Sequence, residues 1–331
     1  MTAATGIGSL PGNDIDRAIA LVFDLLPELP HLPELPARGA GSDMIGRTAA
    51  SLLDLHVDLQ PAGWRLVPRP GLEERNAAAV LERDVDALLP FADYDGTVKV
   101  QLAGPWTLAA SLELPRGGKV LADRGATRDV IDALAETAQT HLAEVGRRLP
   151  GASLLLQLDE PSLPAVLAGV IPTESGFGRL PARDSPDLVA GLATTIAAVD
   201  APVVVHCCAE QPPIRLLHQA GARAVSVDLT ATSGRLDPDE LGECVEAGLG
   251  LWLGVVPAVG PGVPPTVRDV LAPVRRLWSA LGFPVDRLPE EVTLTPACGL
   301  AGASSGWTHT ALRLVSQAAR ALSEAPETIP S

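Results

Sequence analysis

Short apolar runs recur along the chain, and every run but the weakest is followed by a segment with helical spacing. The runs lie near residues 5, 32, 97, 153, 202, 224, 251 and 292. Uncharged runs of this length are typical of buried strands in a parallel sheet, with helices as the crossover connections. This alternation over 331 residues predicts an α/β fold, a (β/α)8 TIM barrel forming a single domain over residues 1–331.

An open, doubly wound sheet is the alternative architecture. Its nucleotide-binding forms carry G-x-G-x-x-G after the first strand or G-x-x-x-x-G-K-[ST], and neither motif occurs at such a place in this sequence. The first hundred residues fit the alternation least well. Here we predict helices over residues 14–26, 43–58 and 72–89, and an extended arm over residues 63–69.

Charge and cysteine usage limit the class of protein. The formal net charge of −15 argues against nucleic acid and anionic membrane as partners. The first residues lack the basic and apolar regions of a signal peptide, and no apolar run approaches the length of a membrane span. Two of the four cysteines are adjacent, which does not suit a disulfide framework. We therefore expect a cytoplasmic protein.

Polar and reactive residues stand where the apolar runs end. In a barrel the carboxyl ends of all strands face one mouth, which is where active sites lie. The residues at these ends are Ser9, Gly104, Asp159 with Glu160, His206 with Cys208, Asp228, and Cys298. Stability of the fold does not require polar and reactive residues at so many strand ends. We therefore predict that this ring of residues forms a functional site at the mouth of the barrel.

A zinc site is the sharpest interpretation of this ring. Zinc takes Cys, His and carboxylate ligands, usually four. Residues two apart on a strand point to the same side, so His206 and Cys208 can reach one ion while Cys207 points away. Cys298 and Asp228 would complete the set. The alternative is that the cysteines are small core residues and His206 a hydrogen-bonded buried imidazole.

A zinc ion with two sulfur ligands suits a particular reaction class. Metal coordination deprotonates a thiol whose ordinary pKa is about 8.5, which creates a nucleophile at neutral pH. A weak oxygen ligand can give way to a substrate thiol. The ligand set thus predicts alkyl transfer to a bound thiol rather than hydrolysis, for which more histidines are usual.

The sequence resembles the C-terminal catalytic barrel of cobalamin-independent methionine synthase, in the uroporphyrinogen-decarboxylase-like superfamily. Five motifs carry the resemblance in family order: IGSLP (7–11), GPWT (104–107), QLDEP (157–161), HCC (206–208) and PACGL (296–300). They span nearly the whole chain. The family's N-terminal barrel has no counterpart, so the chain is similar to the short, single-domain forms.

The resemblance implies a role for each matching residue. His206, Cys208 and Cys298 match the family's zinc ligands, and Asp228 stands where the family has a Glu as fourth ligand. Asp159 matches the carboxylate that binds the amino group of homocysteine. Ser9 matches the residue that binds the substrate carboxylate. The implied cofactor is Zn²⁺, and the implied partners are homocysteine and a methyl donor, methyltetrahydrofolate or a methylated corrinoid.

Two departures from the family pattern bear on the substrates. The family has an acid in the second βα loop that also holds the amino group, and Arg38 stands there instead. The loop after strand seven carries a His in folate-using members, and residues 254–260 have none. The amine of methylfolate must be protonated to leave, whereas a cobalt-bound methyl group leaves without a proton. The second departure favours a corrinoid or another activated donor.

Two other functions stay open from the sequence. One is a metal-free decarboxylase of the uroporphyrinogen type, which would need basic residues for propionates and would have no use for His206 and Cys298. The other is a zinc-binding barrel that has lost catalysis, as the missing acid and His would permit.

Overall fold

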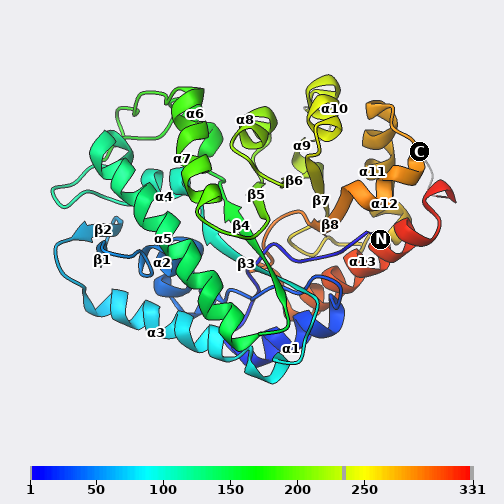
Figure 1. Cartoon of the computed structure of the whole chain (residues 1–331), viewed down its shortest axis with the longest axis horizontal. Coiled ribbons are helices and arrows are strands. Elements are labelled where there is room, and N and C mark those ends of the chain that lie inside the picture. The colour runs from blue at the N-terminus through cyan, green and yellow to red at the C-terminus, as the bar shows by residue number, and fades with distance from the viewer. Residues whose placement is uncertain (1, 233–235, 329–331) are drawn as a thin grey trace.

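A curved sheet of six parallel strands forms the centre of the computed structural model, which describes residues 2–232 and 236–328 (Figure 1). Residues 1, 233–235 and 329–331 of the predicted domain lie outside the described residues. The strands pair in sequence order, β3 to β8. They are β3 (Thr97–Ala103), β4 (Ser153–Asp159), β5 (Val203–Cys207), β6 (Ala224–Asp228), β7 (Gly250–Val256) and β8 (Val292–Pro296). All six lie where the sequence predicted strands.

The first two predicted strands are present only as isolated bridges. Ala4 pairs with Leu294 of β8, His31 pairs with Lys99 of β3, and Ser9 pairs with Glu34, all in parallel. The two segments thus touch both edges of the six-stranded sheet and each other, but neither forms a continuous strand. Prolines recur through residues 27–36 and carry no backbone N–H, which interrupts a ladder. A complete eight-stranded barrel was the prediction, and an α/β fold with a six-stranded sheet is what the described residues form.

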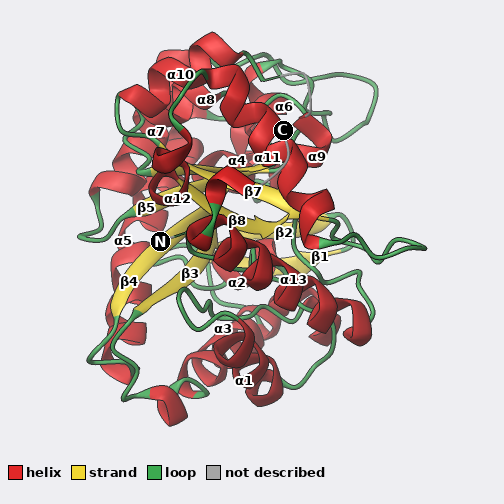
Figure 2. Ribbon diagram, turned by 90° about the vertical axis from the view of Figure 1, so that its right-hand side faces the viewer, coloured by secondary structure: helices red, strands yellow, loops and turns green. Residues whose placement is uncertain are grey.

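Helices surround the sheet on its outer side, as Figure 2 shows from a second direction. The longest is α5, and its Asp123 cap accepts a hydrogen bond from the Ala126 backbone. The α-helices are α1 (Ile15–Leu25), α2 (Met44–Ala49), α3 (Leu72–Asp86), α4 (Pro105–Ser111), α5 (Arg124–Arg148), α6 (Leu163–Leu167), α7 (Ser185–Ala197), α8 (Ile214–Gln219), α9 (Leu229–Thr232), α10 (Pro238–Glu246), α11 (Val267–Leu281), α12 (Leu288–Glu291) and α13 (Ser305–Glu324). Short 3₁₀ helices span Pro36–Arg38, Ala40–Ser42, Leu89–Phe91, Val120–Ala122, Val285–Arg287 and Pro326–Thr328.

The helix predicted over residues 43–58 is wrong in its second half. Helix α2 ends at Ala49, and Asp54 adopts a left-handed φ of 61°, which an α-helix does not allow. The chain then forms an antiparallel hairpin of β1 (His56–Gln60) and β2 (Gly63–Val67). The second strand confirms the extended arm predicted over residues 63–69.

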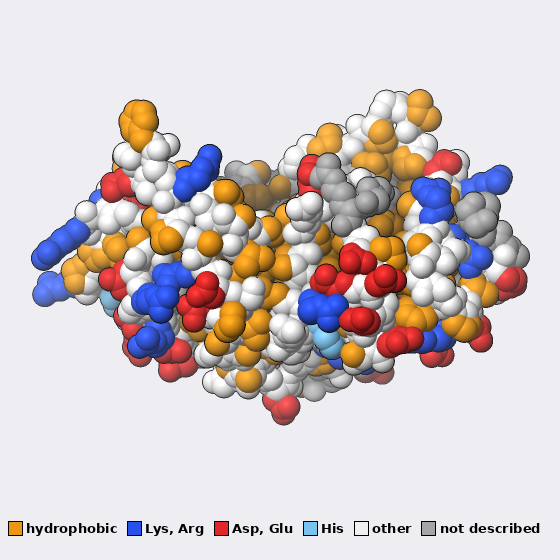
Figure 3. Space-filling view, turned by 90° about the horizontal axis from the view of Figure 1, so that it is seen from above, with side chains coloured by type: hydrophobic (Ala, Val, Ile, Leu, Met, Phe, Trp, Pro, Cys, Tyr) orange, Lys and Arg blue, Asp and Glu red, His pale blue; other side chains and the backbone are white. Residues whose placement is uncertain are grey.

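The outer surface of the molecule carries mixed charge. On the face seen in Figure 3, Lys and Arg side chains stand in small groups beside Asp and Glu. Within residues 2–232 and 236–328, no helix is both long enough and apolar enough to cross a bilayer.

Candidate metal and substrate site

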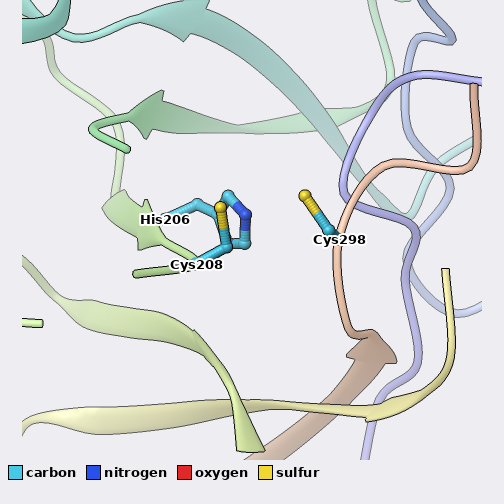
Figure 4. A group of neighbouring side chains, drawn as sticks. All are labelled: His206, Cys208 and Cys298. Carbon is cyan, nitrogen blue, oxygen red and sulfur yellow. The ribbon is translucent and has the colours of Figure 1, made fainter. Parts of the chain in front are cut away.

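His206, Cys208 and Cys298 come together at the carboxyl ends of the strands (Figure 4). Their potential ligand atoms all lie within 4.8 Å of one another. His206 is the penultimate residue of β5, Cys208 follows that strand, and Cys298 lies in the loop after β8. Two segments that are distant in the sequence thus point a nitrogen and two sulfurs at one place.

The His206 ring is oriented by the neighbouring strand. Its Nδ1 lies 3.0 Å from the Oγ of Ser226, the residue beside it in the β5–β6 register. The ring is buried, and its Nε2 has no hydrogen-bond partner among the described residues. An unpaired buried nitrogen is costly unless something binds it. Together with two cysteines, this free nitrogen fits a divalent metal such as zinc.

The two sulfurs of the group are not equivalent. Hydrogen bonding to Cys208 lowers the pKa of the Cys298 thiol to about 4, and the pKa of Cys208 rises in return. The nearness of Cys208 and His206 thus favours a thiolate at this place. Cys207 is fully buried, and burial raises its pKa to about 12. Cys207 is thus a core thiol, as strand alternation predicts.

Asp228 is not part of this group in the described structure. It ends β6, and its Oδ1 accepts hydrogen bonds from the backbone and hydroxyl of Thr230 at 2.8 and 2.6 Å. The same oxygen accepts from the Ala231 backbone at 3.1 Å. The carboxylate thus fastens the start of α9.

Asp159 lies beside the metal group, next to His206 in the β4–β5 register. Burial raises the pKa of its carboxyl to about 7, against the opposing effect of the nearby His206. Oδ1 accepts a hydrogen bond of 2.6 Å from Gln157. The hydrogen bond from Gln157 engages Oδ1 and leaves Oδ2 available to a substrate.

The neighbouring Glu160 has a different task. It is fully buried and accepts hydrogen bonds from the backbone of Trp106 and Thr107 at 2.8 and 2.9 Å, and from the Thr107 hydroxyl at 2.7 Å. Burial raises its pKa to about 7. Glu160 therefore caps α4, and of the two acids in the QLDEP motif it is Asp159 that lies beside His206 in the sheet.

Ser9 lies against the loop that carries Cys298. Its carbonyl accepts the backbone N–H of Leu300 at 2.7 Å. A Cβ on Gly299 would stand 2.1 Å from the Ser9 Oγ, so a side chain at position 299 would force the Ser9 hydroxyl to rotate away. The structure therefore places Ser9 beside the residue that follows Cys298.

Sequence reasoning missed a set of buried polar residues beneath this site: His31, Glu34, Lys99, Gln101 and Gln157. A signal was available, since Lys99 and Gln101 alternate with valines in the apolar run of β3. In a barrel strand such alternation marks the inward face.

Arg38, which replaces the expected acid, does not face the substrate region. It forms two hydrogen bonds to Asp84, of 2.7 and 2.6 Å. Arg47 also binds Asp84, at 2.7 Å, and lies 3.7 Å from Glu34. Glu34 is buried, which raises its pKa, and its charge reaches Asp159. The segment around residues 31–38 thus carries an acid whose charge acts on Asp159, but at position 34 and not at position 38, where the family has it.

Comparison with protein families identifies the class of protein to which this fold and strand-end group belong. The family profile described as "Cobalamin-independent synthase, Catalytic domain" matches residues 1–321, and the chain belongs to this family. The protein is accordingly a methyltransferase. No curated protein sequence matches the chain.

Two solved structures share the fold at low sequence identity. One is a B12-independent methionine synthase from Shewanella sp. W3-18-1 in complex with selenomethionine, with 13% identity, 97% coverage of both chains and a TM-score of 0.60. The other is a methyltransferase from Methanosarcina mazei, with 12% identity, coverage of 96% of this chain and 93% of that one, and a TM-score of 0.61.

Proposed function

We propose that the protein transfers a methyl group to the thiol of homocysteine at a zinc site formed by His206, Cys208 and Cys298. The observation that carries the proposal is the grouping of these three side chains around the unpaired Nε2 of His206. When bound there, zinc would lower the pKa of a substrate thiol so that it reacts as the thiolate. The family match over residues 1–321 supports the reaction class.

The other residues of the site would hold the amino acid. In this proposal the free Oδ2 of Asp159 accepts the substrate ammonium, and Ser9 binds the substrate carboxylate. Ser226 keeps the His206 ring turned so that Nε2 faces the two sulfurs. Asp228 is our proposed fourth ligand in the absence of substrate, for which it would leave the α9 backbone. Closure of an eight-stranded barrel over residues 1–331 belongs to the same proposal, and the bridges of Ala4 and His31 support it.

For the methyl donor we propose a methylated corrinoid before methyltetrahydrofolate. The loop after β7 carries no protonatable side chain over residues 254–260. The folate amine would need a proton in order to leave. This departs from the cobalamin independence in the family's description, and it rests on this chain's own loop.

Bound zinc in wild type and in Cys298→Ser tests the metal proposal. We expect one zinc per chain in wild type and at least a roughly 100-fold lower affinity in the variant, since loss of even an outer contact costs 10–100-fold. Cys244→Ser is the matched control, because Cys244 is a buried thiol on α10 and should leave zinc unchanged. Equal metal content in Cys298→Ser and wild type would remove Cys298 as a ligand.

Turnover of homocysteine with each donor tests the reaction. We expect methionine from methylcobalamin and none from methyltetrahydrofolate. The reverse result would refute the donor proposal while leaving the acceptor in place. No methionine from either donor, with zinc bound, would refute the proposed acceptor reaction.

A further inference from the structure

Lys99 stands at the floor of the site with its charge fully enclosed. It is 0% exposed on β3. Its Nζ donates to the carbonyl of Ile7 at 2.7 Å, to Oε1 of Gln157 at 2.7 Å and to Oε1 of Gln101 at 3.2 Å. Burial lowers the pKa of Lys99 to about 7, and the three acceptors match the three N–H donors of its protonated form, which they hold in one position.

The position of Lys99 dictates the orientation of the Gln157 amide. Because Oε1 of Gln157 accepts from Lys99, its NH₂ must point the other way. That NH₂ donates to the Ile7 carbonyl at 2.9 Å and to Oδ1 of Asp159 at 2.6 Å. Both of its other neighbours are acceptors, so a flipped amide would set an oxygen against a carboxylate and a carbonyl.

This chain of contacts ends on the carboxylate that would hold the substrate. With Oδ1 of Asp159 fixed by Gln157, the free Oδ2 has a single orientation at the end of β4. The charge of Lys99 also reaches Asp159. A carboxylate fixed in advance binds a cation more tightly than one that must be ordered on binding.

We propose that Lys99, acting through the Gln157 amide, is a positioning residue that makes the site selective for thiols bearing an amino group. The inference rests on the proposed role of Asp159 in binding the substrate ammonium. It adds two residues to the site, neither of which touches the metal group. Lys99 acts on recognition of the amine and leaves the thiol subsite alone.

The experiment compares homocysteine with 4-mercaptobutanoate, which lacks only the amino group, in zinc-loaded protein. Dissociation constants by calorimetry and kcat/KM are measured for wild type, Lys99→Met and Gln157→Met. Methionine matches glutamine in length, is one atom shorter than lysine, and removes the hydrogen bonds of both side chains. Gln139→Met is the control, because Gln139 is an exposed amide on α5 that donates to Ala198.

In both site variants we expect the preference for homocysteine to fall by roughly 10- to 100-fold, the value of a hydrogen bond to a charged group. The change should appear in the dissociation constant and KM of homocysteine, with 4-mercaptobutanoate and zinc content unchanged. The control should keep the wild-type preference. A general loosening of the fold would weaken both thiols alike, and equal losses would overturn the inference.

The two proposals fail in different ways. Wild-type protein that prefers homocysteine yet transfers no methyl group would refute the proposed function, and the binding ratios would still decide the role of Lys99. Wild-type protein that binds both thiols equally well would overturn the inference even if methyl transfer occurs. Should Lys99→Met fail to fold, Gln157→Met tests the amide through which Lys99 acts, and an unchanged preference for homocysteine in that variant would overturn the inference.

Discussion

Strands β3–β8 and the N-terminal segments reach the same site by different means. The six strands pair through backbone ladders and pack apolar faces against helices. The segments around Ile7 and Leu32 pair with the sheet edges only through isolated backbone bridges, and side chains of the sheet add hydrogen bonds to them. Lys99 and Gln157 donate to the Ile7 carbonyl, and Gln101 donates to the Leu32 carbonyl at 2.6 Å. Farther from the site, charged side chains also connect these segments: Arg38 and Arg47 both bind Asp84.

The difference explains where this fold buries polar side chains. A ladder fixes register without polar side chains, so β5 can be apolar until its last residues. A segment without a ladder needs other donors, and those donors become part of the site. We therefore expect the N-terminal part to be sensitive to loss of charge, and the six-stranded part to loss of volume.

The sharpest test of this contrast is Asp84→Asn. Asp84 is 0% exposed and neutralises Arg38 and Arg47, so the variant leaves two cations without their buried partner. We expect the free energy of unfolding to fall by about 3–5 kcal/mol in urea titrations. As a control, Glu243→Gln breaks the exposed pair with Arg215 and should leave the urea midpoint where it is. If Asp84→Asn lowered the free energy of unfolding as little as the control does, the proposed contrast between the two parts of the molecule would be wrong.

In the six-stranded part the matching change is Leu253→Ala on β7. Leu253 is 1% exposed, and truncation leaves a cavity in the core. We expect a loss of about 2–5 kcal/mol in the free energy of unfolding. The loss should be the same at low and high salt, because no charge is involved. A strong salt dependence would show that charges matter in this half as well.

Acid should destabilise the protein through His141, which lies on α5 close to the charge of Arg47. Burial lowers the pKa of His141 to about 4, against an ordinary value of 6.5. Between these values the unfolded chain binds the proton and the folded one does not, so stability is complete above pH 6.5 and falls as the pH approaches 4. The loss attributable to His141 is about 3 kcal/mol at pH 4.

His141→Leu provides the measurement, as the difference between its unfolding free energies at pH 7 and pH 4. We expect this difference to be smaller than that of wild type by about the same amount. Identical pH profiles in the two proteins would mean that the imidazole is protonated as readily in the folded chain as in the unfolded one.

The smallest effect concerns a polar contact within the six-stranded part. Ser226→Ala removes the hydroxyl at His206 Nδ1. Zinc affinity should drop by about 10- to 100-fold, as found for outer contacts of metal ligands, and the urea midpoint should barely move. Competition with a zinc chelator measures the affinity. Unchanged affinity would mean that β5 alone orients the ring.

Local sequence patterns predicted the six strands of the sheet. Each of the six strands is an apolar run of adequate length, so its position could be read without knowledge of its neighbours. The meeting of His206 and Cys208 with Cys298 followed from strand alternation and the shared mouth. Their role as ligands is still a prediction.

What escaped prediction depends on distant partners. Lys99 can be buried in a strand because the Ile7 carbonyl and Gln157 accept hydrogen bonds from it, and no local sequence pattern shows these partners. The same holds for Glu34. Its effect on Asp159 and the pairing of Arg38 with Asp84 both depend on residues that are distant in the sequence. The helix expected over residues 43–58 failed because the chain turns after Ala49, adopts a left-handed conformation at Asp54 and enters a hairpin at His56.

The bridge between Ala4 and Leu294 has a consequence for how the protein is made. The two partners lie almost a full chain length apart, so the first segment emerges from the ribosome long before its neighbour exists. Until then the first segment lacks its partner in β8, and contacts of such large sequence separation form slowly. The segment that carries the Ile7 carbonyl therefore gains its β8 partner only after translation of the last strand.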